Sequence, residues 1–242
     1  MLLKKITKIF FNRLPIRLRC LIISTFQERG NTLVGAGSYV HPSVHILGKA
    51  NVHIGANTCL SEGCWLNVNH RVENKGAIVI GNNCFIGKHN FFTSGDAISI
   101  GDYTLTTLGC KFIGSTHKFD NPEVPYLLAG TTCEDRIQIG VNCFFGAGAT
   151  VLGNVKIGHG SIIGAESLVL QDVPPFSIAV GNPAIVIKRY SFSKKAWLLV
   201  SDMSSDDEVG MPNEQEYLEQ LKTKFPIVNL PWIAAGKSMG DL

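Results

Sequence analysis

Charged residues are scarce in this chain, at 17% of 242 residues, and the two signs nearly cancel to a net charge of +3. A positive charge so small and so scattered forms no basic patch, and we therefore exclude nucleic acid as a partner. The seven cysteines include no Cys-x-x-Cys pair, and we identify no secretory signal. Reduced structural thiols are predicted rather than a metal site or a disulfide framework.

Long apolar runs are also missing. Residues 1–26 mix apolar side chains with lysine and arginine, and their longest uncharged run is too short to span a bilayer. We assign 1–30 as a basic amphipathic helical segment, for which two interpretations stay open. The segment caps the first coil of a repeat fold, or it rests on an anionic membrane surface. The expected location is the cytoplasm, with peripheral contact at the inner face of the membrane under the second interpretation.

What the chain does have is a six-residue period. An apolar residue recurs at every sixth position, in the series Ile139, Phe145, Val151, Ile157, Ile163 and Val169. This period predicts a parallel β-helix, in which each unit is one short strand plus one turn and three units make a coil. The class is therefore all-β, and the 25 glycines of the sequence suit the turns.

The same period continues upstream and predicts about six coils in a domain over residues 31–190. It is interrupted at 47–53, 67–79, 93–99 and 113–138, and each interruption predicts a loop that leaves the coil at a corner. Four cysteines fall four places after an apolar position, where a small buried side chain is needed: Cys64, Cys84, Cys110 and Cys143. Four histidines lie on or beside the repeat at positions expected to face solvent: His41, His45, His53 and His159.

The period stops after Arg189. Residues 194–200 and 214–225 are interpreted as helices, so we predict a C-terminal helical appendage over 191–242. It would pack on the coils or on a neighbouring subunit.

One histidine is placed where chemistry is expected. His117 lies at the mouth of the longest interruption, 113–138, and catalytic groups concentrate on loops held by a rigid scaffold. Imidazole titrates near neutral pH, which makes it the usual general base for a hydroxyl or an amine. His70 lies in the loop at 67–79 and is a weaker candidate for substrate contact.

Three segments carry a family resemblance. They are IQIGVNCFFGA at 137–147, DVPP at 172–175, and GNPA at 181–184 followed by Lys188. With the spacing from Ile100-Gly101 to His117, they make residues 34–190 resemble the hexapeptide-repeat acyltransferases. Within that family the similarity is to the galactoside, maltose and Nod-factor O-acetyltransferases and to O-acetyltransferases of bacterial surface polysaccharides.

The resemblance implies a left-handed β-helix, a homotrimer, and acetyl-coenzyme A as acyl donor between neighbouring chains, with no metal. His117 would be the general base, and Asn90 would lie near the acceptor. The cofactor-binding positions implied by the family are Ala147 and Ala165 for pantetheine, and Lys188 with Arg189 for the phosphates. Two positions depart from the family, because Gln171 and Ile185 stand where relatives often have lysine.

The leading hypothesis is an O-acetyltransferase whose carbohydrate acceptor is a bacterial surface polysaccharide, a lipopolysaccharide precursor or a glycoside. One alternative is an N-acetyltransferase of an amino-sugar nucleotide, and another is a non-catalytic β-helix scaffold. The related metal-dependent enzymes need a three-histidine site, and the spacing of His70, His89 and His117 supplies no such motif.

Overall fold

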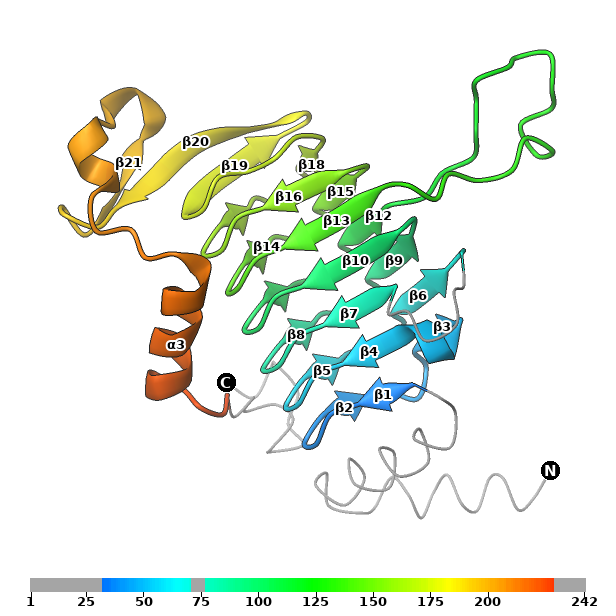
Figure 1. The fold of residues 1–242 in the computed structure, drawn as a ribbon, viewed down its shortest axis with the longest axis horizontal. Helices are drawn as coiled ribbons and strands as arrows, with labels where there is room; N and C mark the ends of the chain where they lie inside the picture. The colour runs from blue at the N-terminus through cyan, green and yellow to red at the C-terminus, as the bar shows by residue number, and fades with distance from the viewer. Residues whose placement is uncertain (1–31, 71–76, 229–242) are drawn as a thin grey trace.

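The computed structural model describes residues 32–70 and 77–228. The helix expected within 1–30 lies outside the described residues. Short strands repeat around the described chain and form three sheets (Figure 1). Neighbouring coils pair in parallel, which makes the domain a parallel β-helix.

Each coil gives one strand to each sheet, and the six strands of the first sheet count six coils, as the period predicts. Sheet A contains β1 (Leu33–Val34), β4 (Val52–Ile54), β7 (Ile78–Ile80), β10 (Ala97–Ile100), β13 (Arg136–Ile139) and β16 (Val155–Ile157). Sheet B contains β2 (Tyr39–Val40), β5 (Cys59–Leu60), β8 (Phe85–Ile86), β11 (Leu105–Thr106), β14 (Phe144–Phe145) and β17 (Ile162–Ile163), followed by β19 (Ser177–Gly181), β20 (Ala184–Ser191) and β21 (Ala196–Leu199). Sheet C contains β3 (His45–Leu47), β6 (Trp65–Val68), β9 (Phe91–Ser94), β12 (Lys111–Ile113), β15 (Thr150–Leu152) and β18 (Leu168–Val169).

The apolar residues of the period form the core. Their registers stack one coil on the next, as in Ile80 on Ile100 and Phe92 on Phe112. The rings of Phe92 and Phe112 lie stacked with centroids 4.8 Å apart. The four cysteines of the repeat are buried as predicted. Their small side chains fit the inner corners where two sheets meet.

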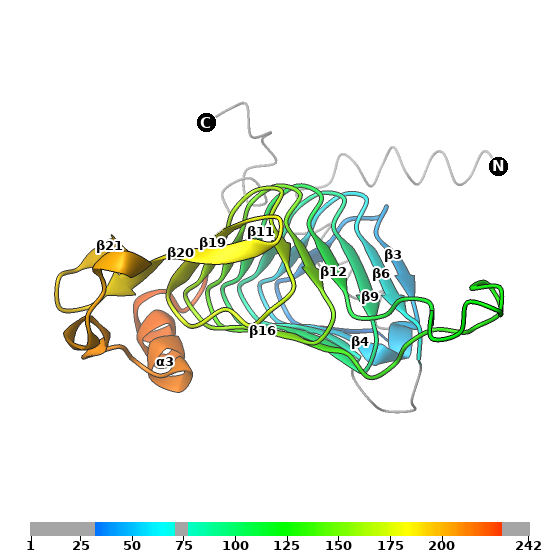
Figure 2. The ribbon, with the colours of Figure 1, turned by 90° about the horizontal axis from the view of Figure 1, so that it is seen from above.

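Every interruption of the period falls at the same corner, between a sheet C strand and the next sheet A strand. The first holds the short 3-10 helix η1 (Lys49–Asn51), and the fourth is the long segment 114–135 that we call the excursion. In Figures 1 and 2 the excursion projects away from the coils.

The third interruption is not a loop, so that prediction is wrong. β9 and β10 are each extended to four residues and turn directly into one another at Gly95 and Asp96. The root of the excursion passes close by, because a Cβ atom on Gly95 would lie 2.1 Å from the carbonyl oxygen of Gly114. Only glycine fits this corner without a shift of the excursion.

The helix predicted over 194–200 is also wrong. Residues 194–195 complete the turn into β21, and residues 196–199 form the strand itself, which pairs antiparallel with β20. The rings of Tyr190 and Trp197 meet edge to face across that pair, with centroids 5.3 Å apart. An aromatic cross-strand pair favours a sheet, and seven residues of sequence are too few to distinguish the two periods.

The second C-terminal helix is confirmed as α3 (Glu214–Lys224), after the 3-10 helices η2 (Val200–Asp202) and η3 (Ser205–Glu208). α3 lies along the turns that join sheet A to sheet B (Figure 2). The Glu214 carboxylate accepts from the Val141 backbone N–H at 3.0 Å, and the Tyr103 hydroxyl donates to the Phe225 carbonyl at 2.8 Å. The described C-terminal residues 200–228, called the C-terminal segment below, therefore pack on their own coils.

His159 was expected to face solvent, and the structure buries it. Its Nε2 donates to the Pro212 carbonyl at 3.0 Å, and its ring packs on Phe176 with centroids 4.9 Å apart. His159 is buried because the C-terminal segment covers this turn. No local sequence pattern could predict that contact.

Candidate active site

His117 lies on the outgoing arm of the excursion, and its side chain is exposed. The returning arm runs antiparallel beside it, with an isolated bridge between His117 and Thr131. The Lys118 N–H donates to the Gly130 carbonyl at 3.0 Å, and the Thr132 N–H donates to the Thr116 carbonyl at 2.8 Å. The imidazole is thus presented by two antiparallel arms that are joined at one isolated bridge, rather than by an irregular loop.

Two backbone hydrogen bonds fix the root of the excursion to the coils. The Gly114 N–H donates to the Thr93 carbonyl at 2.8 Å, and the Asp96 N–H donates to the Asp135 carbonyl at 2.9 Å. Arg136, the first residue of β13, also forms an ion pair with Asp96. The position of His117 is therefore set by the corner beneath it.

The returning arm was missed by the sequence analysis. Its two threonines interact with the outgoing arm, where the Ser115 hydroxyl donates to the Thr132 carbonyl at 2.8 Å and the Thr116 N–H donates to the Thr132 hydroxyl at 3.0 Å. The only signal in the sequence is that a Ser-Thr pair and a Thr-Thr pair stand at opposite ends of one interruption.

Asn90 lies at a different corner, in the turn from β8 to β9. Its side chain is 1% exposed, and its amide nitrogen donates to the carbonyl oxygens of Gly87 and Thr107 at 3.0 and 2.6 Å. The first bond closes its own turn, and the second ties this coil to the next. The structure does not bring Asn90 together with His117, and its predicted catalytic role stays a prediction.

Ala147 and Ala165 occupy the same corner as Asn90, one coil apart, in the turns from sheet B to sheet C. The two turns are stacked so closely that a Cβ atom on Gly146 would lie 2.4 Å from the Ala165 nitrogen. Within the described residues, neither alanine N–H has a hydrogen-bond partner. The small side chains leave these two donors open to a ligand that lies along the corner.

Lys188 and Arg189 are consecutive on β20 and point to opposite faces of the strand. The Arg189 guanidinium forms an ion pair with Glu208 of η3, which holds it against the C-terminal segment. Lys188 is half-buried and forms no ion pair within the part of the chain that the structure describes. Of the two predicted phosphate contacts, Lys188 is the one whose charge is available.

The candidate residues therefore form two groups at opposite ends of sheet C. Ala147 and Ala165 lie where the sheet C strands begin, and the excursion with His117 leaves where they end. Because the excursion projects away from its own coils (Figure 2), one chain does not bring the two groups together.

The buried thiols supply no nucleophile. Burial raises the pKa of Cys64 to about 11 and the pKa values of Cys84 and Cys143 to about 12. A thiol with so high a pKa stays protonated at neutral pH, and the thiolate is the reactive form. Reduced structural thiols are thus the assignment that the structure supports.

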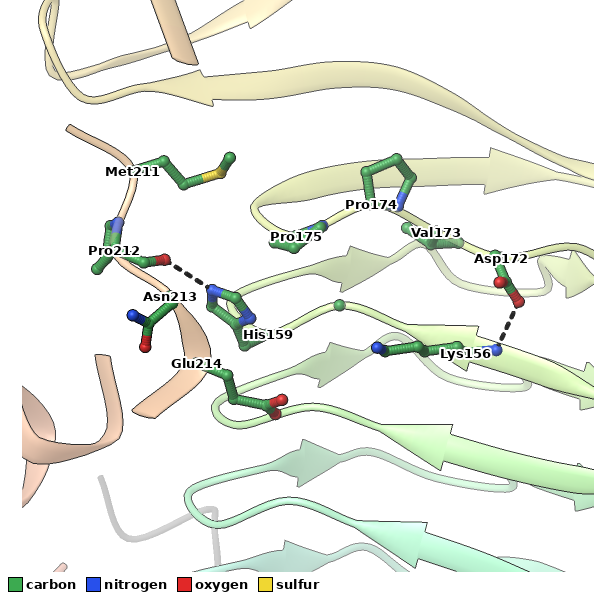
Figure 3. Close-up of a pocket in the computed structure, with 11 residues that line it drawn as sticks. Lys156, His159, Asp172, Val173, Pro174, Pro175, Met211, Pro212, Asn213 and Glu214 are labelled. Carbon is green, nitrogen blue, oxygen red and sulfur yellow. Dashed lines mark hydrogen bonds between the residues drawn. The ribbon is translucent and has the colours of Figure 1, made fainter. Parts of the chain in front are cut away.

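A cleft of about 590 Å³ lies elsewhere, between the last coil and the segment 211–214 (Figure 3). The Lys156 side chain lies along it, and the Asp172 carboxylate accepts from the Lys156 backbone N–H at 2.8 Å. It contains none of the predicted site residues. Within residues 32–70 and 77–228, no cluster of three metal-ligating side chains is found, and no helix there is long and apolar enough to cross a membrane.

Comparison with known proteins supports an acyltransferase fold. Residues 136–171 match the family described as bacterial transferase hexapeptide (six repeats). A candidate acetyltransferase of Staphylococcus aureus (strain Mu50) is 39% identical over 114 residues, which are 46% of this chain and 55% of the relative. The chain thus spans about half the length of that relative. Chloramphenicol acetyltransferase of Agrobacterium fabrum (strain C58) is 27% identical over 167 residues, 67% of this chain and 71% of the relative.

In three dimensions, a mutant form of AntD, an N-acyltransferase from Bacillus cereus in complex with dTDP and coenzyme A, matches with a TM-score of 0.59. The match covers 70% of this chain and 90% of that chain at 20% identity, and it shows the fold alone. The family match over residues 136–171 and the two relatives show that the chain is similar to hexapeptide-repeat proteins and to proteins named as acetyltransferases. The finer O-acetyltransferase branch is not distinguished by them.

Proposed function

We propose that the protein is an acetyl-coenzyme A-dependent O-acetyltransferase, with His117 as its general base. The acceptor is a sugar hydroxyl of a bacterial surface polysaccharide, a lipopolysaccharide precursor or a glycoside. The observation that carries the proposal is the exposed imidazole of His117 on an anchored two-stranded arm. The same proposal includes left-handed coils, a homotrimer and a cytoplasmic location.

The chemistry needs no covalent intermediate on the protein. The His117 imidazole takes the proton of the acceptor hydroxyl while its oxygen attacks the thioester carbonyl. The tetrahedral oxyanion then collapses, the carbon–sulfur bond breaks, and the leaving thiolate takes the proton from the imidazolium. The open N–H groups of Ala147 and Ala165 suit the amide carbonyl groups of a pantetheine chain, and the Lys188 ammonium suits its phosphates.

The direct test is transfer of labelled acetyl groups from acetyl-coenzyme A to a panel of polysaccharides, glycosides and amino-sugar nucleotides. Mild base then separates the products, because it cleaves an O-acetyl ester and leaves an N-acetyl amide intact. We expect a base-labile product. A base-stable product would transfer the assignment to amino sugars, the class of ligand seen in a complex of the AntD N-acyltransferase with dTDP-4-amino-4,6-dideoxyglucose and coenzyme A. Failure of the protein to bind coenzyme A would contradict the enzyme proposal.

The separation of His117 from the alanine corner predicts a site shared between chains. We expect both His117→Ala and Ala165→Trp, which fills the corner, to be inactive alone. Trimers reassembled from an equal mixture should recover about a quarter of the wild-type activity, because one interface in four would join two intact halves. A mixture that stays inactive although the variants exchange subunits, or an active monomer by light scattering, would contradict the shared site.

The phosphate contact gives a prediction for binding. Lys188→Ala should raise the KM for acetyl-coenzyme A by about tenfold or more, because a charge-assisted hydrogen bond to phosphate contributes about 1.5–3 kcal/mol. The kcat should change far less, since the phosphates are remote from the thioester. Lys156→Ala, on sheet A, is the control. The reverse change, Gln171→Lys, should tighten coenzyme binding, and unchanged affinity in both variants would place the coenzyme elsewhere.

A further inference from the structure

A second histidine contacts the arm that carries His117. His70 follows β6 in the second coil, whereas the excursion leaves the fourth coil. Its Nε2 lies 3.1 Å from the Thr132 carbonyl oxygen and 3.1 Å from the Thr131 hydroxyl oxygen. Thr131 is the residue whose backbone pairs with His117. One imidazole therefore connects the body of the β-helix to the strand directly beside the proposed base.

The direction of these bonds follows from their partners. A carbonyl oxygen only accepts, so Nε2 must carry a hydrogen, which it shares with the Thr131 hydroxyl oxygen. The Thr132 carbonyl also accepts from Ser115 at 2.8 Å, and so it joins His70 to both arms.

His70 is itself held in place by its neighbours. The Asn69 amide donates to the Thr93 hydroxyl at 2.9 Å, and the Asn67 amide donates to the Asn69 side-chain oxygen at 2.7 Å. Thr93 is 5% exposed and also supplies the carbonyl that anchors Gly114. The segment before His70 and the root of the excursion thus share one buried residue.

We propose that His70 is a positioning residue, which fixes the returning arm of the excursion and through it the orientation of His117. This inference rests on the proposed function. It assigns His70 no contact with the acceptor, and it predicts that a residue two coils away affects the reaction. The alternatives, in which His70 itself takes the proton or only stabilises the fold, give different results in the experiment below.

The position of the arm is measured without the reaction. Cys133 is exposed and directly follows Thr132, and the other cysteines of the described residues are buried. A nitroxide label on Cys133 in a Cys20→Ser background therefore reports the motion of the returning arm. We expect His70→Ala to give a more mobile electron paramagnetic resonance spectrum and His70→Gln, which keeps a donor at the same reach, to give the native one. An unchanged spectrum in His70→Ala would overturn the proposal that His70 fixes the returning arm.

The kinetic measurements use the same variants. Since a displacement of about 1 Å at a reacting group costs about a hundredfold, His70→Ala should lower kcat by about tenfold to a hundredfold. The KM for acetyl-coenzyme A should stay within about threefold, because its proposed site lies at the other end of sheet C. His70→Gln should recover kcat to within about fivefold of the wild type and keep the acid limb of the pH profile. His53→Ala, a histidine on sheet A of the same coil, should leave both constants unchanged.

The outcomes separate two failures. If His70→Gln is as inactive as His70→Ala and loses the acid limb, His70 contacts the reacting atoms and the positioning role is overturned. If His70→Ala raises the mobility of the label on Cys133 but keeps full kcat, the contact of His70 with the returning arm does not affect the reaction. The inference is then also overturned. Full activity in His117→Ala would instead refute the proposed function and leave the mobility result standing.

Discussion

Replacement of His117 by alanine is expected to lower kcat for acetyl transfer by about two to four orders of magnitude, the usual contribution of a positioned general base. The fold should be unaffected, because the side chain is exposed and fills no space in the core. The acid limb of the pH profile of kcat/KM, which reports the base in the free enzyme, should disappear with it. Initial rates with the acceptor identified in the transfer assay provide the measurement.

The control for this variant is His53→Ala, which removes an imidazole from sheet A, away from the excursion. It should keep the wild-type kcat and the wild-type pH profile. Melting temperature and scattering mass should be the same for all three proteins. Near wild-type turnover in a folded His117→Ala protein would remove His117 from the reaction.

Replacement of Phe112 by alanine is expected to lower the free energy of unfolding by about 3–5 kcal/mol. Phe112 is fully buried in β12, where its ring stacks on Phe92 and meets the edge of Phe145 at 5.2 Å. Its removal leaves a cavity at the coil from which the excursion departs. Chemical denaturation at one fixed protein concentration measures the loss, because assembly also contributes to apparent stability.

Phe119→Ala is the matched control for this loss. The same ring is removed, but Phe119 lies in the excursion and is 69% exposed. Its effect should stay within about 0.5 kcal/mol, as for most surface substitutions. A loss below about 1 kcal/mol in Phe112→Ala would mean that the core ladder collapses around the gap.

The coils could be predicted from sequence because one rule is repeated. Each six-residue unit requires an inward-facing residue at the same position. A single departure, such as Thr106 in place of an apolar residue, therefore does not hide the period. The strand β21 and the burial of His159 depend instead on the antiparallel partner β20 and on the C-terminal segment. Contacts of this kind join residues far apart in sequence, and no local period encodes them.

The site could be predicted only in part, for the same reason. His117 could be located because it lies in an interruption of the six-residue period, and such an interruption is recognised from the sequence alone. The pairing of Arg189 with Glu208 and the contact of His70 with Thr132 are tertiary facts. The sequence therefore named His70 as a weak candidate for substrate contact, whereas the structure places it against the arm of the proposed base.

Because all four interruptions fall at one corner, the β-helix has a single edge of variable length beside two that keep a constant length per coil. Segments inserted at successive coils then become neighbours in space, although tens of residues separate them in the chain. Under the proposed function, exchange of segments along this edge would change the acceptor while the coils and the corner with Ala147 and Ala165 are kept.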